Sequence, residues 1–512
     1  MAGFLGAISN CAIVCLVWPA SNPSGSRRPA VDLYSWRLVV LHHSIDSLGS
    51  CSSVSWGSNG AMLTTSSARV GIQALSHSVV RVRMLPPSDE DLRLPPSFAV
   101  IEPGWPAPAV AHEEMTDYVR ISTSDITVRV QKHPLRVSFL RPDGMPVAAD
   151  SPAHGMGWTE RGAGCYKRFA PGTHFYGFGE RTGFLDKQRT AMTLWNSDVN
   201  PHTPGTDSLY VSIPFFIAFS GRSAYGIYMD TAARSAFNMG RPRFMPWTSE
   251  IDLAPLPYPE VDPCEYWFGT DEKRLDYYFF AGPTIPDVVR AYSDLTGRMQ
   301  LPPLWALGYH QCRFSYCPEG QVREVARAMR EADIPCDAIY LDIDYMDGFR
   351  VFTFNPKHFP NLARLMSDLR KDGFNVVTIV DPGVKTDSSY RVYRQGRRRR
   401  VFVRRPDGKT YKGRVWPGVV AYPDFARPAS RTWWADNHKV LFDAGVRGIW
   451  NDMNEPSNFA TDTGTLDETA LHGEPGADVK HAYVHNAYGN LMSQATQEAF
   501  TRLLPNTRPF II

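Results

Sequence analysis

The stretch GIWND at residues 448–452 is a short apolar run that ends in an acidic residue, and it decides the fold class. The same arrangement occurs in AIYLD at 338–342 and in VVTIVD at 376–381. Between the runs, apolar residues recur every three or four positions over 322–329 and 362–369, as in amphipathic helices. This alternation predicts a parallel sheet covered by helices. Acids at the C-terminal ends of successive strands are typical of a (β/α)8 barrel, and no glycine-rich phosphate loop follows these strands.

Two further segments extend this pattern, Trp305–His310 before the three runs and Arg508–Ile512 after them. The three runs and the two segments give five predicted strands, whereas a closed barrel has eight. We therefore expect residues 304–512 to form a (β/α)8 TIM barrel that is truncated after about the fifth strand.

The segment before the barrel has a different periodicity. Apolar and polar residues alternate over 126–130 and 135–139, and Pro-Asp-Gly at 142–144 predicts a turn. A period of two with turn residues predicts an antiparallel β-sandwich, which we place at residues 61–283. A helical pattern followed by two prolines predicts a linker helix at residues 284–303.

Residues 1–60 show no sustained strand or helix period, so we expect a leader that is disordered or a weak signal peptide. The apolar run at 11–18 favours a signal peptide, but no Lys or Arg precedes it, and it is too short to span a membrane. The eight cysteines include no pair of CxxC motifs, so they indicate no metal site and leave the compartment open. A cytoplasmic location is favoured, with secretion as the alternative.

Charge and composition bear on the partners. Lys and Arg number 54 against 52 Asp and Glu, a net charge of +2 that favours neither nucleic acid nor a membrane as a partner. The basic run Arg397–Arg400 favours a solvated hairpin over a polyanion site. Aromatic residues make up 12% of the chain, which suits sugar binding as well as ordinary cores. The oligomeric state stays open.

The run at 448–452 continues as MNEPSNF and places two carboxyl groups, Asp452 and Glu455, three residues apart where a barrel strand opens into its loop. Cleavage of a glycosidic bond through a covalent intermediate needs an ionised carboxylate at the anomeric carbon and a second carboxyl that donates a proton. A bare Asp-x-x-Glu is more often a turn cap beside a surface acid. The spacing alone therefore leaves both interpretations open.

The surroundings of these carboxyls resemble glycoside hydrolase family 31, the α-glucosidase family. GIWNDMNEPSNF at 448–459 resembles the nucleophile signature of that family. Further blocks follow the family's order: YGFGERTG at 176–183, LWNSD at 194–198, LWALGYHQCR at 304–313, LDIDYMD at 341–347 and VWPG at 415–418. The resemblance extends from about Gly60 to the last residue.

The resemblance implies roles for individual residues. Asp452 would be the catalytic nucleophile, and Glu455 would lie behind it and orient it. Asp342 matches a residue that binds hydroxyls of the terminal glucose, and Asp198 would reach the same sugar from the sandwich. The other matched substrate-binding residues are Trp416, Trp450, Met453, Phe314 and Ile343. Two alternatives stay open, namely that Trp450 belongs to the core and that Asp198 is a turn former.

The resemblance implies a retaining exo-α-glycosidase, most directly an α-glucosidase that releases terminal glucose from maltose-like α-glucosides without a metal or organic cofactor. An α-xylosidase, a transglucosidase or an α-glucan lyase of the same family is an alternative, and so is a non-catalytic sugar-binding relic or a fragment. In the family the acid/base carboxylate follows a later barrel strand than the one resembled by Arg508–Ile512. We therefore expect the acid/base residue to be absent from this chain.

Overall fold

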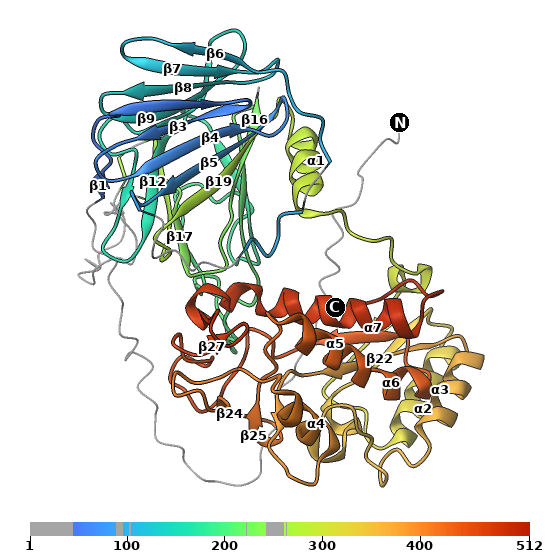
Figure 1. The fold of residues 1–512 in the computed structure, drawn as a ribbon. Coiled ribbons are helices and arrows are strands. Elements are labelled where there is room, and N and C mark those ends of the chain that lie inside the picture. Colours follow the sequence, from blue (N-terminus) through green and yellow to red (C-terminus); the bar gives the residue numbers. More distant parts are fainter. Residues whose placement is uncertain (1–44, 89–95, 102–103, 222, 242–260, 263) are drawn as a thin grey trace, which may run out of the picture.

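The computed structural model describes residues 45–88, 96–101, 104–221, 223–241, 261–262 and 264–512, so most of the leader predicted at residues 1–60 lies outside the described residues. Its described part is not a disordered leader, because it contributes the strands Asp46–Ser47 and Ser53–Gly57 to the sandwich. A β-sandwich precedes a domain of parallel strands and helices (Figure 1). In the described ranges, no helix combines the length and the apolar character that a transmembrane span requires.

Two antiparallel sheets form the sandwich. The larger sheet contains β1 (Asp46–Ser47), β6 (Ala111–Glu114), β7 (Tyr118–Ser122), β8 (Thr127–Lys132), β9 (Leu135–Leu140), β10 (Pro146–Asp150), β11 (Met156–Trp158), β12 (Ala163–Arg168), β14 (Ala191–Leu194), β17 (Ser235–Asn238) and β18 (Glu265–Thr270). The smaller sheet contains β2 (Ser53–Gly57), β3 (Gly60–Thr64), β4 (Arg69–Ala74), β5 (Val79–Leu85), β13 (His174–Gly179), β15 (Ser212–Phe219), β16 (Ala224–Met229) and β19 (Leu275–Ala281).

The alternating apolar residues of the sequence are the inner face of this sandwich. β8 and β9 pair with Val128 opposite Phe139, and both side chains are buried. Phe139 stacks on Phe279 of the other sheet with ring centroids 3.9 Å apart. Burial of each such side chain stabilises the fold by roughly 1.5–3 kcal/mol. The prediction of an antiparallel sandwich is confirmed.

Helix α1 (Ile285–Thr296) covers the outer face of the smaller sheet. Thr284 begins it with a capping box, in which Thr284 and Asp287 each bond the backbone N–H of the other residue. Val288 is buried, and Tyr292 stacks on Phe215 of β15 at 3.9 Å. The helix is therefore packed on the sandwich along its length.

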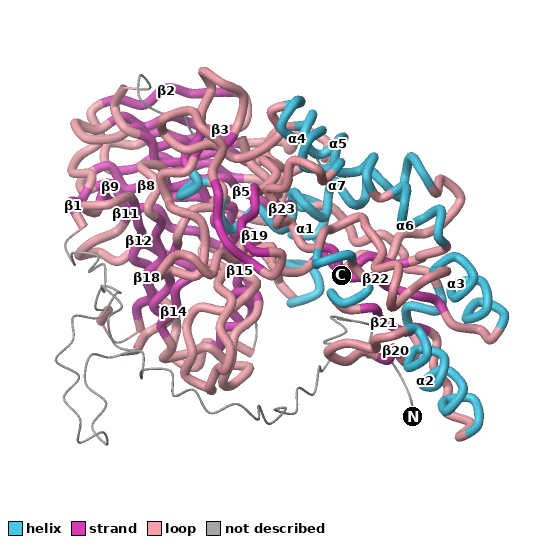
Figure 2. Tube along the Cα trace, turned by 90° about the horizontal axis from the view of Figure 1, so that it is seen from below, coloured by secondary structure: helices cyan, strands magenta, loops and turns pink. Residues whose placement is uncertain are grey.

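The second domain is built on four parallel strands in sequence order: β20 (His310–Gln311), β21 (Ala338–Leu341), β22 (Asn375–Val380) and β26 (Gly448–Asn451). Ile511 adds a parallel bridge to Ile449 of β26. The helices are α2 (Glu319–Glu331), α3 (Leu362–Lys371), α4 (Arg391–Arg399), α5 (Pro428–Asn437), α6 (Lys439–Ala444) and α7 (Tyr488–Leu503). Figure 2 shows α2 and α3 alongside β20, β21 and β22. Among the described residues, the strands form an open sheet, not a closed barrel.

Short elements decorate this sheet. Three antiparallel strands form one inserted sheet, β23 (Val384–Lys385), β24 (Lys412–Val415) and β25 (Gly418–Ala421), and two more form a ribbon, β27 (Leu471–His472) and β28 (Val479–Lys480). The 3-10 turns are η1 (Leu304–Leu307), η2 (Ile343–Tyr345), η3 (Asp347–Phe349), η4 (His481–Tyr483) and η5 (His485–Ala487).

Two local predictions are wrong. The strand expected at Trp305–His310 begins only at His310, because Leu304–Leu307 turns so that the Gly308 N–H donates to the Trp305 carbonyl. The hairpin expected at Arg397–Arg400 is instead the end of helix α4. Its arginines are exposed, as expected of a solvated run, and they lie at the C-terminal end, where the helix dipole favours cations.

Asn486, between η4 and α7, joins the two domains. Its backbone N–H donates to the Ala232 carbonyl of the sandwich, and its side-chain amide donates to the carbonyls of Leu194 and Ala233. Its side-chain oxygen accepts from the Asn196 N–H at 2.9 Å. One half-buried side chain therefore satisfies several backbone groups of the other domain, which fixes the sandwich loop that follows β14.

Candidate active site

Three acids follow three neighbouring strands at one edge of the parallel sheet. Asp342 comes directly after β21, Asp381 after β22 and Asp452 after β26. β21 pairs with β22 and β22 pairs with β26, all in parallel, so their C-terminal ends meet at this edge. The backbone N–H of Asp452 also donates to the Val380 carbonyl at 3.3 Å. The edge therefore gathers acids that are far apart in the sequence.

The electrostatics confirm that these acids are close to one another. Burial is the main cause that raises the pKa of Asp342 to about 6, and the charge of Asp452 raises it further. Burial and the same charge raise the pKa of Asp381 well above its ordinary value. Burial also raises the pKa of Asp452, whereas the Met453 N–H, bonded to the carboxylate, lowers it. Desolvated like charges of this kind are typical of functional sites.

Glu455 lies on the loop that Asp452 begins. Its side chain is buried and accepts a hydrogen bond from the Ser457 hydroxyl at 2.7 Å. Burial raises its pKa to about 7, with a smaller contribution from the charge of Asp452. Between the two acids Met453 adopts a left-handed φ of 58°, a conformation that costs energy for a residue other than glycine. The loop is thus held in a strained, specific conformation beside the strand end.

The side chain of Met453 is buried away from solvent. It packs in a small cluster with Val415, Val420 and Tyr422 of the inserted sheet and the segment that follows it. The inserted sheet therefore supports the loop from outside, which accounts for how the strained backbone is maintained.

Asp198 reaches this edge from the sandwich, on the loop between β14 and β15. Its charge raises the pKa of both Asp452 and Glu455, so the three carboxyl groups lie near one another. Partial burial raises the pKa of Asp198 itself, and the Tyr210 hydroxyl opposes this shift. That hydroxyl also donates to the Val199 carbonyl at 2.8 Å, which fixes the loop next to Asp198.

The predicted aromatic residues occupy different environments. Trp450 is half-buried and meets Tyr340 edge to face at 6.1 Å on the inner side of the strands. Trp416 lies at the turn between β24 and β25, is 46% exposed and meets Phe459 edge to face at 5.2 Å. Phe314 is 67% exposed. Trp416 and Phe459 thus present an exposed aromatic pair near the loop that carries Glu455.

Ile343 lies directly after Asp342, and its side chain is 4% exposed within the main core of the second domain. Its backbone N–H donates to the Asp342 side chain at 2.7 Å. Ile343 therefore contacts the acid cluster through its backbone N–H.

Two residues of the cluster were not among the predicted site residues. Asp381 is buried at the strand end between Asp342 and Asp452, and the sequence signal for it is the acid that ends the run at 376–381. Phe459 ends the stretch at 448–459, and nothing in the sequence shows that it would meet Trp416.

No group of three or more His, Cys, Asp or Glu side chains is placed to hold a metal ion within the described ranges. Among the described cysteines, Cys51, Cys165, Cys264, Cys317 and Cys336 are free thiols.

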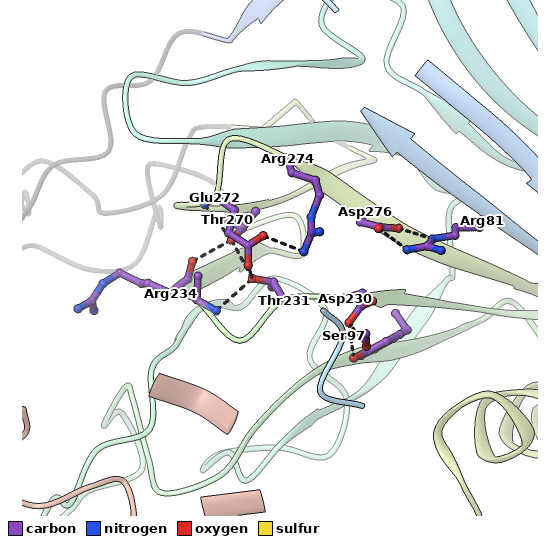
Figure 3. Close-up of polar contacts among 11 residues, drawn as sticks. Arg81, Ser97, Asp230, Thr231, Arg234, Thr270, Glu272, Arg274 and Asp276 are labelled. Atoms are coloured by element: carbon purple, nitrogen blue, oxygen red, sulfur yellow. Dashed lines mark hydrogen bonds and ion pairs between the residues drawn. The ribbon is translucent and has the colours of Figure 1, made fainter. Parts of the chain in front are cut away.

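A cavity of about 640 Å³ with polar and apolar walls lies where the two domains meet. Figure 3 shows the charged residues of its sandwich wall. Glu272 accepts a hydrogen bond from Thr231 at 2.7 Å and pairs with Arg274 at 3.2 Å, and Asp230 accepts from the Ser97 hydroxyl at 2.7 Å. The side of the cavity formed by the second domain includes Asn451, Asn454, Asn490 and Ser493. These sandwich carboxyls have side-chain partners in their own domain, and a like charge, that of Asp452, raises the pKa of Asp342 in the second domain.

Two family models match the chain. The model described as the TIM-barrel domain of glycosyl hydrolases family 31 matches residues 299–512. The model described as the glycosyl hydrolase 31 N-terminal galactose mutarotase-like domain matches residues 69–238. The two matches fall on the parallel-sheet domain and on the sandwich, respectively.

Known proteins resemble the chain over most of its length. It is 42% identical over 445 residues to alpha-glucosidase 2 of Bacillus thermoamyloliquefaciens, a match that covers 86% of this chain and 53% of that protein. It is 34% identical over 360 residues to neutral alpha-glucosidase AB of Homo sapiens, covering 66% of this chain and 37% of that protein. A family 31 dextranase of Flavobacterium johnsoniae, solved with glucose, superposes with a TM-score of 0.78 at 27% identity and covers 91% of this chain and 55% of its own. The chain thus spans about half the length of these relatives or less.

Proposed function

This chain belongs to glycoside hydrolase family 31, and on that premise we propose that it acts as a retaining exo-α-glycosidase, specifically an α-glucosidase. The observation that supports the proposal best is the position of Asp452, which stands at a strand end among buried carboxyl groups with Asp198 of the other domain close by. The relatives named as alpha-glucosidases support glucose as the sugar.

In the proposed reaction, a carboxylate oxygen of Asp452 attacks the anomeric carbon of the terminal glucose. The bond from that carbon to the leaving oxygen breaks, and the leaving oxygen takes a proton from a carboxylic acid. Water then attacks the glycosyl-enzyme, loses a proton to the same acid/base group and releases glucose with its configuration retained. The cluster of negative charge stabilises the positive charge that develops on the sugar ring in each step.

The other site residues are assigned to the terminal sugar. Asp342 and Asp198 accept hydrogen bonds from its hydroxyl groups, so that the two domains hold it between them. Trp450 and the aromatic pair of Trp416 and Phe459 provide apolar faces for the sugar rings. Phe314 extends this aromatic lining further out, whereas Met453 and Ile343 shape the pocket through their backbone.

The proton donor is a separate question. Glu455 accepts a hydrogen bond from the Ser457 hydroxyl and lies on the same loop as Asp452. Both features support a role in orienting Asp452. Asp381 is 4% exposed between the strand ends, and burial together with the charge of Asp452 raises its pKa, which supports a place inside the acid cluster and not at the leaving oxygen. We therefore propose that the acid/base carboxyl lies outside the described residues.

The parallel sheet is proposed to be the first part of a (β/α)8 barrel. β20, β21, β22, β26 and the bridge at Ile511 follow one another in the sequence and run parallel, as consecutive barrel strands do. In such a barrel the active site lies at the C-terminal ends of the strands, which is where the acid cluster is found.

The anomeric form of the first product tests the function. A protein that contains this chain together with the acid/base carboxyl is incubated with maltose, and the products are followed by proton NMR before glucose mutarotates. We expect glucose in the α form. Initial β-glucose would rule out retention, an unsaturated anhydro sugar would indicate a lyase, longer oligosaccharides would indicate a transferase, and binding without any turnover would indicate a sugar-binding relic.

Asp198→Ala is expected to weaken binding of the terminal sugar, although the residue belongs to the sandwich. A charge-assisted hydrogen bond to a sugar hydroxyl is worth roughly 1.5–3 kcal/mol, so KM for maltose should rise about tenfold to a hundredfold. Steady-state kinetics measure the effect, and Asp143→Ala on an exposed sandwich turn is the matched control. Equal KM values for both variants would remove Asp198 from the sugar site.

A further inference from the structure

A chain of three buried histidines crosses the junction between the domains. His472 of β27, His481 of η4 and His485 of η5 are each 0% exposed. Asp424 Oδ1 lies 3.0 Å from His472 Nδ1, and His472 Nε2 lies 3.0 Å from His481 Nδ1. His481 Nε2 lies 2.9 Å from His485 Nδ1, and His485 Nε2 lies 2.8 Å from the carbonyl oxygen of Asn196. Four hydrogen bonds thus run from a carboxyl group of the second domain to the sandwich.

These four hydrogen bonds need more protons than neutral rings supply. A neutral imidazole has one N–H donor and one bare nitrogen acceptor. Both ends of the chain are oxygens that accept, if the Asp424 carboxyl is ionised. Four bonds need four protons, and three neutral histidines carry three. The complete chain therefore holds one additional proton, either as an imidazolium or on Asp424.

That additional proton belongs to the Asp424 end. Burial lowers the pKa of His481 well below its ordinary value, and it lowers the pKa of His485 to about 3. Asp424 contacts His472, and its second oxygen accepts from the Gly473 N–H at 2.9 Å. The Asp424 carboxylate therefore compensates the positive charge of a proton that it shares with His472. A positive charge on His481 or His485 is not compensated in this way.

Charged and aromatic groups flank both ends of the chain, and the group that supports this placement is Arg234 at the sandwich end. At the Asp424 end, Arg431 of α5 interacts with the charge of Asp424, and the Tyr488 ring of α7 lies against His472 at 6.3 Å. At the sandwich end, Trp195 stacks on His485 at 3.6 Å. Arg234 lies over the Trp195 ring and pairs with Glu468. The guanidinium of Arg234 disfavours a positive charge on His485.

The position of the proton fixes the direction of every hydrogen bond. His472 then donates from Nε2 to His481, His481 donates from Nε2 to His485, and His485 donates from Nε2 to Asn196. If the shared proton leaves to solvent, His472 keeps its Nδ1–H on the Asp424 carboxylate. His481 and His485 then donate from Nδ1 instead, and His485 Nε2 presents a lone pair to the Asn196 carbonyl. Loss of one proton at Asp424 thus breaks the hydrogen bond at the far end.

We propose that Asp424, His472, His481 and His485 form a proton relay that positions the Asp198 loop, with His485 as the positioning residue that holds Asn196 two residues before Asp198. The inference rests on the sugar-binding role proposed for Asp198. When the additional proton is present, all four hydrogen bonds form and the loop is held. When it is absent, the hydrogen bond to Asn196 is missing, the loop loses one anchor and the sugar binds more weakly.

The tautomers can be observed without any activity measurement. Histidine is labelled with ¹⁵N in the protein, and the ring nitrogens are followed by long-range ¹H–¹⁵N NMR from about pH 5 to pH 9. His481→Gln and His485→Gln assign the signals. We expect both rings as Nε2–H tautomers at acidic pH and a joint change to Nδ1–H on the alkaline side. Nδ1–H tautomers at acidic pH, or rings that titrate independently, would refute the relay.

Kinetics then test the link to Asp198. His485→Phe keeps a ring on Trp195 but has no donor, and we expect KM for maltose to rise roughly tenfold at acidic pH, the effect of one buried hydrogen bond, with a smaller change in kcat. His485→Gln keeps an amide donor that cannot switch. It should restore most of the binding lost in the Phe variant and remove the alkaline rise in KM.

His77→Gln, at an exposed position of the sandwich, is the control for histidine loss. An alkaline rise in KM that persists in His485→Gln would overturn the coupling. If a protein that also carries the acid/base carboxyl turns over no α-glucoside, the proposed function fails, but the NMR measurement still decides whether the relay exists.

Discussion

In a protein that also carries the acid/base carboxyl, Asp452→Asn is expected to lower kcat for maltose by a factor on the order of 10⁴ or more, with little change in KM. The amide keeps the size and polarity of the side chain, so the sugar still binds. It cannot form the ester bond to the anomeric carbon, so the covalent intermediate is lost. Initial-rate kinetics over a range of maltose concentrations separate the two parameters.

Two further measurements make this result specific. Asp462→Asn, at an exposed position of the same connection, should leave both parameters unchanged. With an activated aryl α-glucoside and azide, Asp452→Gly should give β-glucosyl azide, because azide attacks from the face that the nucleophile has vacated. A fluoro-glycoside trapped on a different carboxyl group would assign the nucleophile elsewhere.

The features that the sequence predicts well are local in origin. The apolar run before Asp452 is a buried parallel strand, so its end and the acid on it could be located from the pattern alone. The alternation around Val128 and Phe139 depends only on strand geometry and identified the sandwich. The family signature then selected Asp452 and Glu455 from many Asp-x-x-Glu spacings, and the family itself is confirmed by both domain models.

The features that could not be predicted from the sequence depend on contacts between distant segments. Met453 and Ile343 match pocket positions of the family, yet both side chains are buried in apolar clusters. This burial depends on where the inserted sheet and the core lie, which the sequence pattern does not give. The basic run at Arg397–Arg400 has no helical signal of its own and becomes helical because Val392 and Tyr393 are buried on one face of α4. His485 meets the carbonyl of Asn196 across 289 positions of sequence, so no spacing predicts it.

Asp150→Ala is expected to destabilise the sandwich by about 3–5 kcal/mol, because it leaves the ammonium group of Lys167 buried without its partner. Both side chains are 0% exposed, and Lys167 Nζ lies 2.6 Å from Asp150 Oδ1. Burial opposes the charge of Lys167, yet the attraction of Asp150 raises the pKa of this lysine well above its ordinary value. The second oxygen of Asp150 accepts from the Val137 N–H at 2.8 Å, so the backbone of β9 also loses a partner.

Urea unfolding measures the loss. At a slope of about 1–3 kcal/mol/M, the transition of the sandwich should move to lower urea by roughly 1 M or more. Glu114→Ala is the matched control, because it removes the partner of Lys132 from a pair in which the Glu114 side chain is 44% exposed, and such pairs contribute about 1 kcal/mol or less. The double variant Asp150→Leu with Lys167→Met removes both charges together and should recover most of the stability, since apolar side chains of similar size can replace a buried ion pair. If Asp150→Ala shifted the transition no more than Glu114→Ala, the charge on Lys167 would have to be compensated by the rings of Phe139 and Tyr277, each 5.2 Å from its Nζ, and the ion pair would not be the stabilising contact.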